Sequence, residues 1–345
     1  MKRIGVCSGL HFAVDFLCAA AMFANYIPGK DGYLWILIYN FCAFALQMPI
    51  GIIADKFANI TAERPLAFYI MVMGTAVTIL GTFTNPIILG TGNALFHVGG
   101  GVESVREDSN ANYKGTGLGV FVAPGALGLY VGTLLSKAGW FIWCRITGIV
   151  LIGILILLLR RCWGNRECTV ENIQEYEMPF GRKYAGILIL CFAVVMLRSY
   201  IGMEVSFPWK TGLAAGIACI MAVVFGKIAG GYLAAKTGIT KAAVSSLGIA
   251  ALLYLFSYIE AAGVLALFFF NMSMPMTLYI LVKRFPRTPG FSFGLLTFAL
   301  FLGFLPVYLG MESPLDVRLL GCMGSVVSLI LLYRCVRRSY ADVSV

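Results

Sequence analysis

Apolar runs of about 18 or more residues follow one another along almost the whole chain. A helix rises about 1.5 Å per residue, so roughly 20 apolar residues cross the ~30 Å hydrocarbon layer of a bilayer. Because lipid offers no hydrogen bonds, backbone groups inside it must bond within the chain, as they do in a helix. The sequence therefore predicts an all-α membrane protein with twelve transmembrane helices. We expect them at residues 5–27, 33–54, 65–84, 86–106, 115–136, 140–160, 184–205, 211–235, 241–259, 262–283, 289–309 and 316–334.

The composition agrees with this class of protein. The chain is 60% hydrophobic and 12% charged, with a mean hydropathy of +0.87, whereas soluble domains are about 25% charged. The first run follows Met1-Lys2-Arg3 and has the outline of a cleaved signal peptide, but His11 and Asp15 interrupt its apolar stretch. We therefore expect this run to remain as the first membrane span.

Lysine and arginine are distributed unequally between the two sets of loops. With the N-terminus inside, 19 of them lie in the inner loops and tails and only four, Lys30, Lys137, Lys210 and Arg318, in the outer loops. Basic loops stay on the cytoplasmic side, so we expect a cytoplasmic-membrane protein with both termini in the cytoplasm. The same bias explains the net charge of +10 by attraction to anionic membrane lipid, and nucleic acid is not an expected partner.

The residue types that carry metal, cofactor or enzyme chemistry form no motif. Most of the ten cysteines lie within spans, and Cys162 and Cys168 lie in a cytoplasmic loop where thiols stay reduced. The two histidines are far apart in the sequence, so no metal site is expected. No phosphate-binding glycine loop or nucleophile constellation is present either. We expect no cofactor, and neither an enzyme nor an ATP-driven pump.

The chain repeats itself at an offset of 180 residues. Phe12-Ala13-Val14 aligns with Phe192-Ala193-Val194, and the same shift matches Gly51 with Gly231 and Lys56 with Lys236. One offset that serves two spans and their loops indicates a duplication. We predict a six-helix half at 1–160, a cytoplasmic linker at 161–183 and a second six-helix half at 184–345, a plan typical of secondary transporters.

Two loop sequences carry a family resemblance. Gly51-Ile52-Ile53-Ala54-Asp55-Lys56 resembles the loop signature of the major facilitator superfamily, and Gly231-Tyr232-Leu233-Ala234-Ala235-Lys236 is similar to its degenerate second copy. In the second copy, Ala235 occupies the position of the acid. The resemblance implies a twelve-helix transporter whose spans 1, 4, 7 and 10 line a central solute cavity.

Three stretches of the first half resemble the fosmidomycin-resistance type of exporter within that superfamily. They are residues 11–15 (His-Phe-Ala-Val-Asp), residues 90–97 (Gly-Thr-Gly through Phe-His) and residues 119–128, a glycine- and proline-containing segment. Val98 replaces the proline that usually follows the histidine, and Glu103 lies later than the acid of that motif. The resemblance implies export, and it does not carry over the identity of the solute.

Asp15 and His97 are the candidate proton-coupling pair, with His11 as a helper. Asp15 lies about 15 Å from the inner end of its span and His97 about 17 Å from the outer end of its own, so the two side chains could meet. His11 precedes Asp15 by four residues and shares its helical face. Such a group could bind and release protons, because burial and a neighbouring charge move its affinity for them. A purely structural polar contact is the alternative.

Arg198 is the candidate solute-binding cation. It stands alone in the apolar stretch 190–201, where an arginine costs at least about 2.5 kcal/mol, so it must face either the cavity or a carboxylate. Asp15 or Glu204 could pair with it, although Glu204 is six residues on and off its helical face. A carboxylate or phosphonate of the solute is the other partner that its planar donors suit.

Further polar residues in the same set of spans are candidate solute contacts. Span 10 contains Asn271, Ser273 and Thr277 around Pro275, which frees a backbone carbonyl. Asn93 precedes His97 by one turn in span 4. Contacts that only pack helices together are the alternative for span 10.

Two segments are candidate gates. Asp55 and Lys56 of the loop signature are expected to hold the inner side closed by contacting neighbouring helix ends, an ordinary solvated loop being the alternative. Pro124 and Gly125 of span 5 can kink the helix and let a neighbour approach closely. Lys227 is interpreted as a lysine that extends toward the cytoplasmic surface, and not as a site residue.

These observations favour a secondary transporter of a small organic solute, with protons, solute and membrane lipid as its partners and a monomer as its state. Proton antiport leading to export is the first hypothesis. Proton-coupled uptake of an anionic solute is the second. A receptor or assembly protein without transport activity is the third, and the short loops argue against it.

Overall fold

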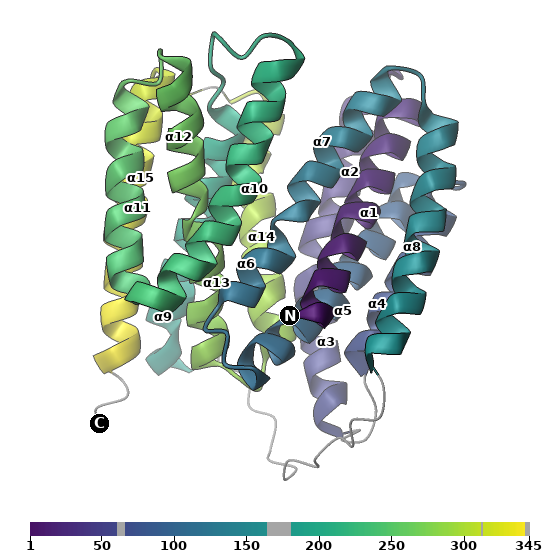
Figure 1. Ribbon diagram of the computed structural model, residues 1–345, viewed down its shortest axis with the longest axis horizontal. Coiled ribbons are helices and arrows are strands. Elements are labelled where there is room, and N and C mark those ends of the chain that lie inside the picture. The colour runs from purple at the N-terminus through teal and green to yellow at the C-terminus, as the bar shows by residue number, and fades with distance from the viewer. Residues whose placement is uncertain (61–65, 164–180, 312, 342–345) are drawn as a thin grey trace. The chain divides into compact units, whose positions relative to one another are not determined.

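The computed structural model describes residues 1–60, 66–163, 181–311 and 313–341 (Figure 1). Helices form all of its regular structure within those ranges. Most of the predicted linker, residues 164–180, lies outside the described residues. The helices are α1 (Lys2–Asn25), α2 (Gly32–Asn40), the π-helix η1 (Phe41–Ala45), α3 (Gln47–Ile60), α4 (Leu66–Gly81), α5 (Pro86–Asn110), α6 (Thr116–Val122), α7 (Pro124–Lys137), α8 (Phe141–Trp163), α9 (Arg182–Glu204), α10 (Gly212–Thr237), α11 (Ile239–Leu255), α12 (Glu260–Asn271), α13 (Ser273–Arg284), α14 (Pro289–Tyr308) and α15 (Val317–Ala341).

Each predicted span coincides with one helix or with consecutive helical segments. Among the described residues, nine helical segments are long and apolar enough to cross a membrane, and α4 and α11 are shorter apolar helices. Helix α5 is 25 residues long, but it carries polar residues such as Asn93 and His97 and is not among the nine. A multi-pass membrane protein is therefore confirmed in outline, while the count of twelve spans stays a prediction.

Prolines explain why two of the predicted spans are broken. A proline has no N–H to donate and its ring meets the carbonyl four residues earlier. Helix α6 accordingly ends at Val122, just before Pro124. Helix α12 ends at Asn271, whose carbonyl lies four residues before Pro275, and α13 begins at Ser273. The 262–283 run, which contains Pro275, is therefore divided into two helices.

The chain divides into two compact units. Unit 1 consists of residues 1–111, 124–178 and 287–298, and unit 2 of residues 112–123, 179–286 and 299–345. The two helices of the 115–136 run therefore belong to different units, α6 to unit 2 and α7 to unit 1. Helix α14 is likewise divided between the two units after residue 298. The halves predicted from the repeat, 1–160 and 184–345, remain a prediction about evolutionary domains.

Helix α1 is the centre of unit 1, because it packs against α5, α7 and α8, while α4 lies along α5 (Figure 1). Glycines allow α4 and α5 to approach each other closely. A Cβ on Gly99 would overlap the backbones of Met71 and Ala67, and one on Gly92 would overlap that of Thr78. Gly92 and Gly99, on either side of His97, thus let α5 pack closely against α4, and this close packing fixes the position of α5 and its polar side chains.

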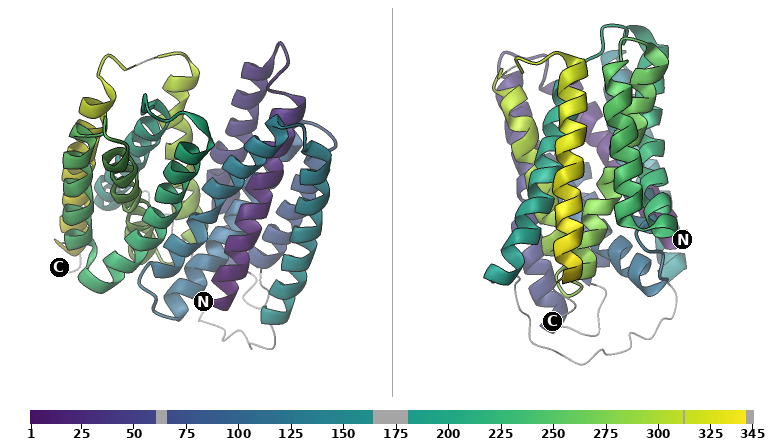
Figure 2. Two further views of the ribbon diagram at one scale, coloured as in Figure 1. Left: turned by 45° about the horizontal axis from the view of Figure 1, so that its top comes forward. Right: turned by 90° about the vertical axis from the view of Figure 1, so that its left-hand side faces the viewer.

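In unit 2, α15 lies beside α9 and α11, as the yellow helix in the right-hand view of Figure 2 shows. Helix α10 packs against α6, α12 and α13. Close approaches again occur at glycines, since a Cβ on Gly226 would meet the backbone of Phe268 and one on Gly230 the backbone of Met272 at the α12–α13 break. The arrangement holds the broken span against a continuous helix.

Candidate functional site

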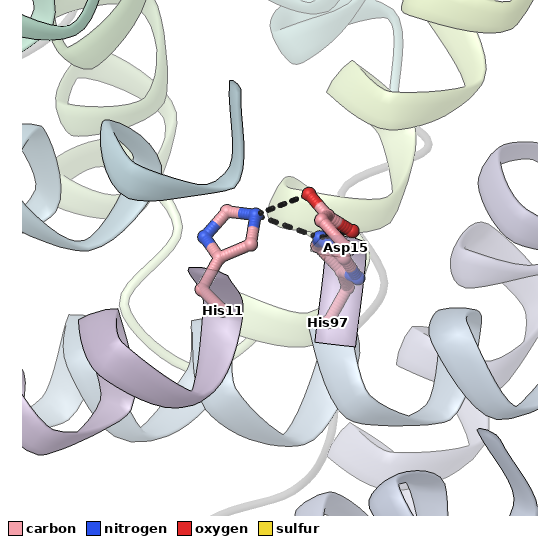
Figure 3. Close-up of side chains that lie close together, drawn as sticks. All are labelled: His11, Asp15 and His97. Atoms are coloured by element: carbon pink, nitrogen blue, oxygen red, sulfur yellow. Dashed lines mark hydrogen bonds and ion pairs between the residues drawn. The ribbon is translucent and has the colours of Figure 1, made fainter. Parts of the chain in front are cut away.

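His11, Asp15 and His97 form one buried cluster in unit 1, which we call the triad (Figure 3). Helix α1 places His11 and Asp15 one turn apart, with His11 Nε2 3.2 Å from Asp15 Oδ2. Helix α5 brings His97, whose Nε2 lies 2.9 Å from His11 Nε2 and 3.7 Å from Asp15 Oδ1. The sequence analysis expected Asp15 and His97 to meet, and the structure brings them together. His11 is more central than expected, because its Nε2 faces both other side chains.

Asn93 fixes the orientation of the triad from the turn before His97. Its side-chain amide donates to Asp15 Oδ1 at 2.9 Å, and its backbone oxygen lies 2.9 Å from His97 Nδ1. A carbonyl oxygen can only accept, so His97 Nδ1 carries the hydrogen and Nε2 of the neutral ring is an acceptor. Asn93 was predicted to contact solute. Here its amide holds Asp15.

Gly125 forms one wall of the triad. A Cβ at this position would overlap His11 Nε2 and lie 2.5 Å from Asp15 Oδ2. The following glycines of α7, Gly128 and Gly132, bring the helix equally close to the backbone of α1. The Pro124-Gly125 segment was predicted to form a gate. The structure places it directly beside the candidate proton site, so a movement of α7 would change the contacts of His11 and Asp15.

The triad can bind one proton in addition to those that its hydrogen bonds already use. A single hydrogen on His11 Nε2 can serve both His97 Nε2 and Asp15 Oδ2. With both imidazoles neutral and Asp15 ionised, the cluster carries one negative charge. Adding a proton removes that charge, which a low-dielectric environment favours. The cluster can therefore exist in two protonation states that differ by one charge.

A metal ion would require the triad to rearrange. Each of the three side chains offers one ligand atom, and these atoms lie within 4.8 Å of one another. Two ligands of a tetrahedral zinc ion are separated by roughly 3.3 Å, given bond lengths of about 2.0 Å. The 2.9 Å between the two Nε2 atoms is shorter and is the distance of a hydrogen bond. The geometry therefore suits a shared hydrogen, and the expectation of no metal site stays a prediction.

Arg198 of α9 lies in unit 2 and is only 7% exposed. Its Nη1 atom is buried and has no hydrogen-bond partner among the described residues. Glu204, one of the partners considered from the sequence, instead accepts from the backbone N–H of Ser313 at 2.6 Å. Asp15, the other, is engaged by His11 and Asn93. A buried guanidinium with an unused donor is a candidate anion-binding group.

The other predicted solute contacts bond within their own span. Asn271 Nδ2 donates to the backbone oxygen of Leu267 at 2.9 Å. Ser273 Oγ donates to that of Phe270, and Thr277 Oγ1 to that of Met274. These hydrogen bonds satisfy the side chains without another helix. Their role as solute contacts remains a prediction.

Asp55 caps the start of α14 within unit 1. Its carboxylate accepts from the backbone N–H of Gly290 at 2.9 Å and of Phe291 at 2.7 Å, and the residue is only 3% exposed. Gly51, one turn earlier, lets α3 touch the Gly290 backbone. The expected contact of Asp55 with a neighbouring helix end is therefore observed. Lys56 is exposed.

The position of Lys227 differs from the one inferred from the sequence. It was interpreted as extending toward the surface, but it is only 9% exposed, and its Nζ donates to the backbone oxygen of Val122 at 3.3 Å. That carbonyl lies at the end of α6, where Pro124 interrupts the helix. The glycines around Lys227, at 226, 230 and 231, were the available signal, because they indicate a helix face that other backbone approaches closely.

Known proteins agree with this architecture at the level of fold. The E. coli fucose:proton symporter FucP is 12% identical, covers 95% of this chain and 97% of its own, and superposes with a TM-score of 0.60. The human organic anion transporter MFSD10 is also 12% identical, covers 96% of this chain and 99% of its own, and has a TM-score of 0.69. No family model matches the sequence, and no curated protein matches it. The chain has the fold of major facilitator superfamily transporters, and these two neighbours are transporters and not enzymes.

Proposed function

We propose that this protein is a major facilitator superfamily transporter that exports a small organic solute across the cytoplasmic membrane in exchange for protons. The triad is the observation that carries the proposal. Two histidines and an aspartate lie buried together in helices that otherwise consist mainly of apolar residues, and ionisable groups inside membrane spans mark ion pathways. The shared fold with a proton symporter supports the proposal.

The triad supplies a proton-carrying step. In its negative state Asp15 is ionised and both imidazoles are neutral. A proton that enters from outside binds the cluster and removes its charge, and its release on the inner side restores the negative state. Because Asn93 holds both Asp15 and His97, the three side chains keep their geometry in both states. Alternating access of the two halves would expose the triad to one side at a time.

The remaining parts of the proposal follow from the sequence. Both termini lie in the cytoplasm, the two halves 1–160 and 184–345 are joined by the linker 161–183, and the protein works as a monomer in lipid. Asn271, Ser273 and Thr277 are the polar contacts for the solute, whereas Asn93 serves the triad. Asp55 and Lys56 act at the inner gate, and Pro124 and Gly125 at the triad. The resemblance of the first half to the fosmidomycin-resistance type favours export.

Proton-coupled uptake is the second candidate. The observation that favours it is the buried Nη1 of Arg198 without a partner among the described residues. An anion that enters together with one proton adds no net charge, and this would satisfy Arg198 and the triad at the same time. The two structural neighbours, a fucose:proton symporter and an organic anion transporter, agree with such a mode.

Proton movement in proteoliposomes tests the proposal. Vesicles that contain the protein and a pH-sensitive dye are exposed to a panel of organic solutes, with the Asp15→Asn variant in parallel. Solute-evoked proton flux that the variant abolishes is the expected result, and the sign of the flux separates exchange from uptake. Solute movement without proton flux would overturn the coupling. The absence of both movements would favour a receptor or assembly protein.

A further inference from the structure

Within the described residues, the unit that contains Arg198 offers this residue no carboxylate. The acids of unit 2 within the described residues are Glu204, Glu260 and Asp316. Glu204 accepts from the N–H of Ser313, and Asp316 pairs with Arg318 at 2.8 Å. Glu260 begins α12 and is exposed. None of these three is within ion-pair distance of Arg198, so the guanidinium has no counter-charge among the described residues of its unit.

Arg198 stays buried although it lies closer to one end of its helix than to the middle. It comes 14 residues after Tyr184 and six before Glu204 in the apolar segment Tyr184–Glu204 and is only 7% exposed, whereas lysine and arginine near helix ends commonly extend to the interface. The following residue, Ser199, is fixed by its hydrogen bond to the backbone oxygen of Leu300 at 2.7 Å. A Cβ on Gly303 would also overlap the backbone of Met196. Helix α9 is therefore held firmly against α14 on either side of Arg198.

A buried arginine with an unpaired donor costs free energy. An unsatisfied buried polar group costs about 1–3 kcal/mol, and more when the group is charged. Asp15 cannot supply a carboxylate without giving up the hydrogen bonds that His11 and Asn93 make to it. The guanidinium presents planar donors that match a carboxylate or phosphonate with two parallel hydrogen bonds. The missing partner therefore has the chemistry of an organic acid.

We propose that the solute is an organic anion and that Arg198 binds its acidic group. This inference rests on the proposed transport function and names the class of solute that it carries. Arg198 acts as a specificity-determining residue, because a neutral solute of the same shape would leave the guanidinium unpaired. Lysine at this position would keep the charge but lose the two-pronged geometry.

A binding assay that needs no proton flux tests the inference. The purified protein is heated in detergent with matched pairs of probes, namely benzoate with benzamide, phenylphosphonate with its diethyl ester, and succinate with succinamide. A ligand that binds only the folded state raises the melting temperature. We expect anions, and not their neutral partners, to raise it in the natural protein. Their affinity should fall at least about 30-fold in Arg198→Gln, with a smaller loss in Arg198→Lys.

Two further variants make the result decisive. Arg145→Gln removes another arginine of a membrane helix, one that lies over the ring of Phe83 at 4.3 Å, and should leave anion binding unchanged. Asp15→Asn, which tests proton coupling, should still bind anions, so a failure of coupling and a failure of this inference are distinguishable. No anion-dependent shift across the panel would overturn the inference. So would anion binding that survives Arg198→Gln with only its pH dependence altered, because Arg198 would then be an ion-pair residue.

Discussion

The two units bury opposite charges. Within the described part of the chain, the buried carboxylates Asp15, Asp55 and Asp108 all lie in unit 1, whereas the buried cations Arg198 and Lys227 both lie in unit 2. The carboxylates of Asp15 and Asp55 have donors within their unit, from imidazole, amide and backbone N–H groups. Arg198 Nη1, a donor, has no acceptor among the described residues.

The difference separates two tasks. A carboxylate surrounded by two imidazoles can gain or lose a proton without losing its hydrogen bonds, so unit 1 suits an ion that binds and leaves repeatedly. A guanidinium stays charged throughout the physiological range, and the described acids of unit 2 do not pair with this one. We infer that unit 1 handles the proton and unit 2 the acidic group of the solute. Four substitutions can break or sharpen this comparison.

Asp15→Leu should have the largest effect on stability. It removes the acceptor that the Asn93 amide and His11 share, and breaking a buried charged pair typically costs about 3–5 kcal/mol. Unfolding in detergent with increasing denaturant measures the loss. The exposed Asp31 is the matched control, and Asp31→Leu should change stability by less than about 0.5 kcal/mol. An equal effect of the two variants would contradict the view that unit 1 is organised around a satisfied carboxylate.

Gly125→Val should abolish coupling while the helices still form. The branched side chain would push His11 and Asp15 apart, because even a Cβ has no room there. Misplacing reacting groups by about 1 Å can cost 100-fold in rate, and we expect a comparable loss of solute-evoked proton flux in proteoliposomes. Gly153→Ala on α8 is the control, since nothing lies within 4 Å of a Cβ at that glycine. Unchanged flux in the valine variant would remove the triad from the proton path.

Arg198→Leu should act in the opposite direction from Asp15→Leu. It removes a buried donor that has no partner, so the free energy of unfolding should rise by about 1–3 kcal/mol, while anion binding is lost. Stability and function would then change in opposite directions at the same residue, as is common at binding sites. Denaturant unfolding of the solute-free protein measures the gain. A loss of stability similar to that of Asp15→Leu would mean that Arg198 already has a structural counter-charge.

The sequence predicted a multi-pass helical membrane protein because hydrophobic length is a strong and additive signal. It also predicted the meeting of Asp15 and His97, since depth in the membrane can be counted along a helix. It could not show that Asn93 orients both residues or that Gly125 touches them. Those contacts depend on the rotation of α5 and α7 about their own axes, which glycine packing against neighbouring helices sets.

Lys227 shows a second limit of prediction. A lysine toward one end of an apolar run reads as a surface anchor, because its long side chain usually reaches water. Its actual partner is the Val122 carbonyl at a proline break in another helix. Which broken helix end faces which lysine is a question of tertiary packing. One sequence contains no direct record of it.

The smallest predicted effect comes from the repeated loop signature. Gly51 touches the backbone at the start of α14, and Asp55, four residues later, caps that helix. Gly231 touches the backbone of Gly115 at the start of α6 in the same way, but the residue four positions later is Ala235. An acid at a helix N-terminus contributes about 0.3–1 kcal/mol.

Ala235→Asp should therefore stabilise the start of α6 by about that amount, seen as slower hydrogen exchange in residues 116–119. The reciprocal change, Asp55→Ala, should speed exchange at Gly290 and Phe291, whose N–H groups it leaves uncapped. If Ala235→Asp destabilises α6, the two loops are alike in sequence and glycine contact but not in the direction of the side chain. The two units would then differ in the backbone geometry at this loop, and not only in having an acid at position 55 and an alanine at position 235.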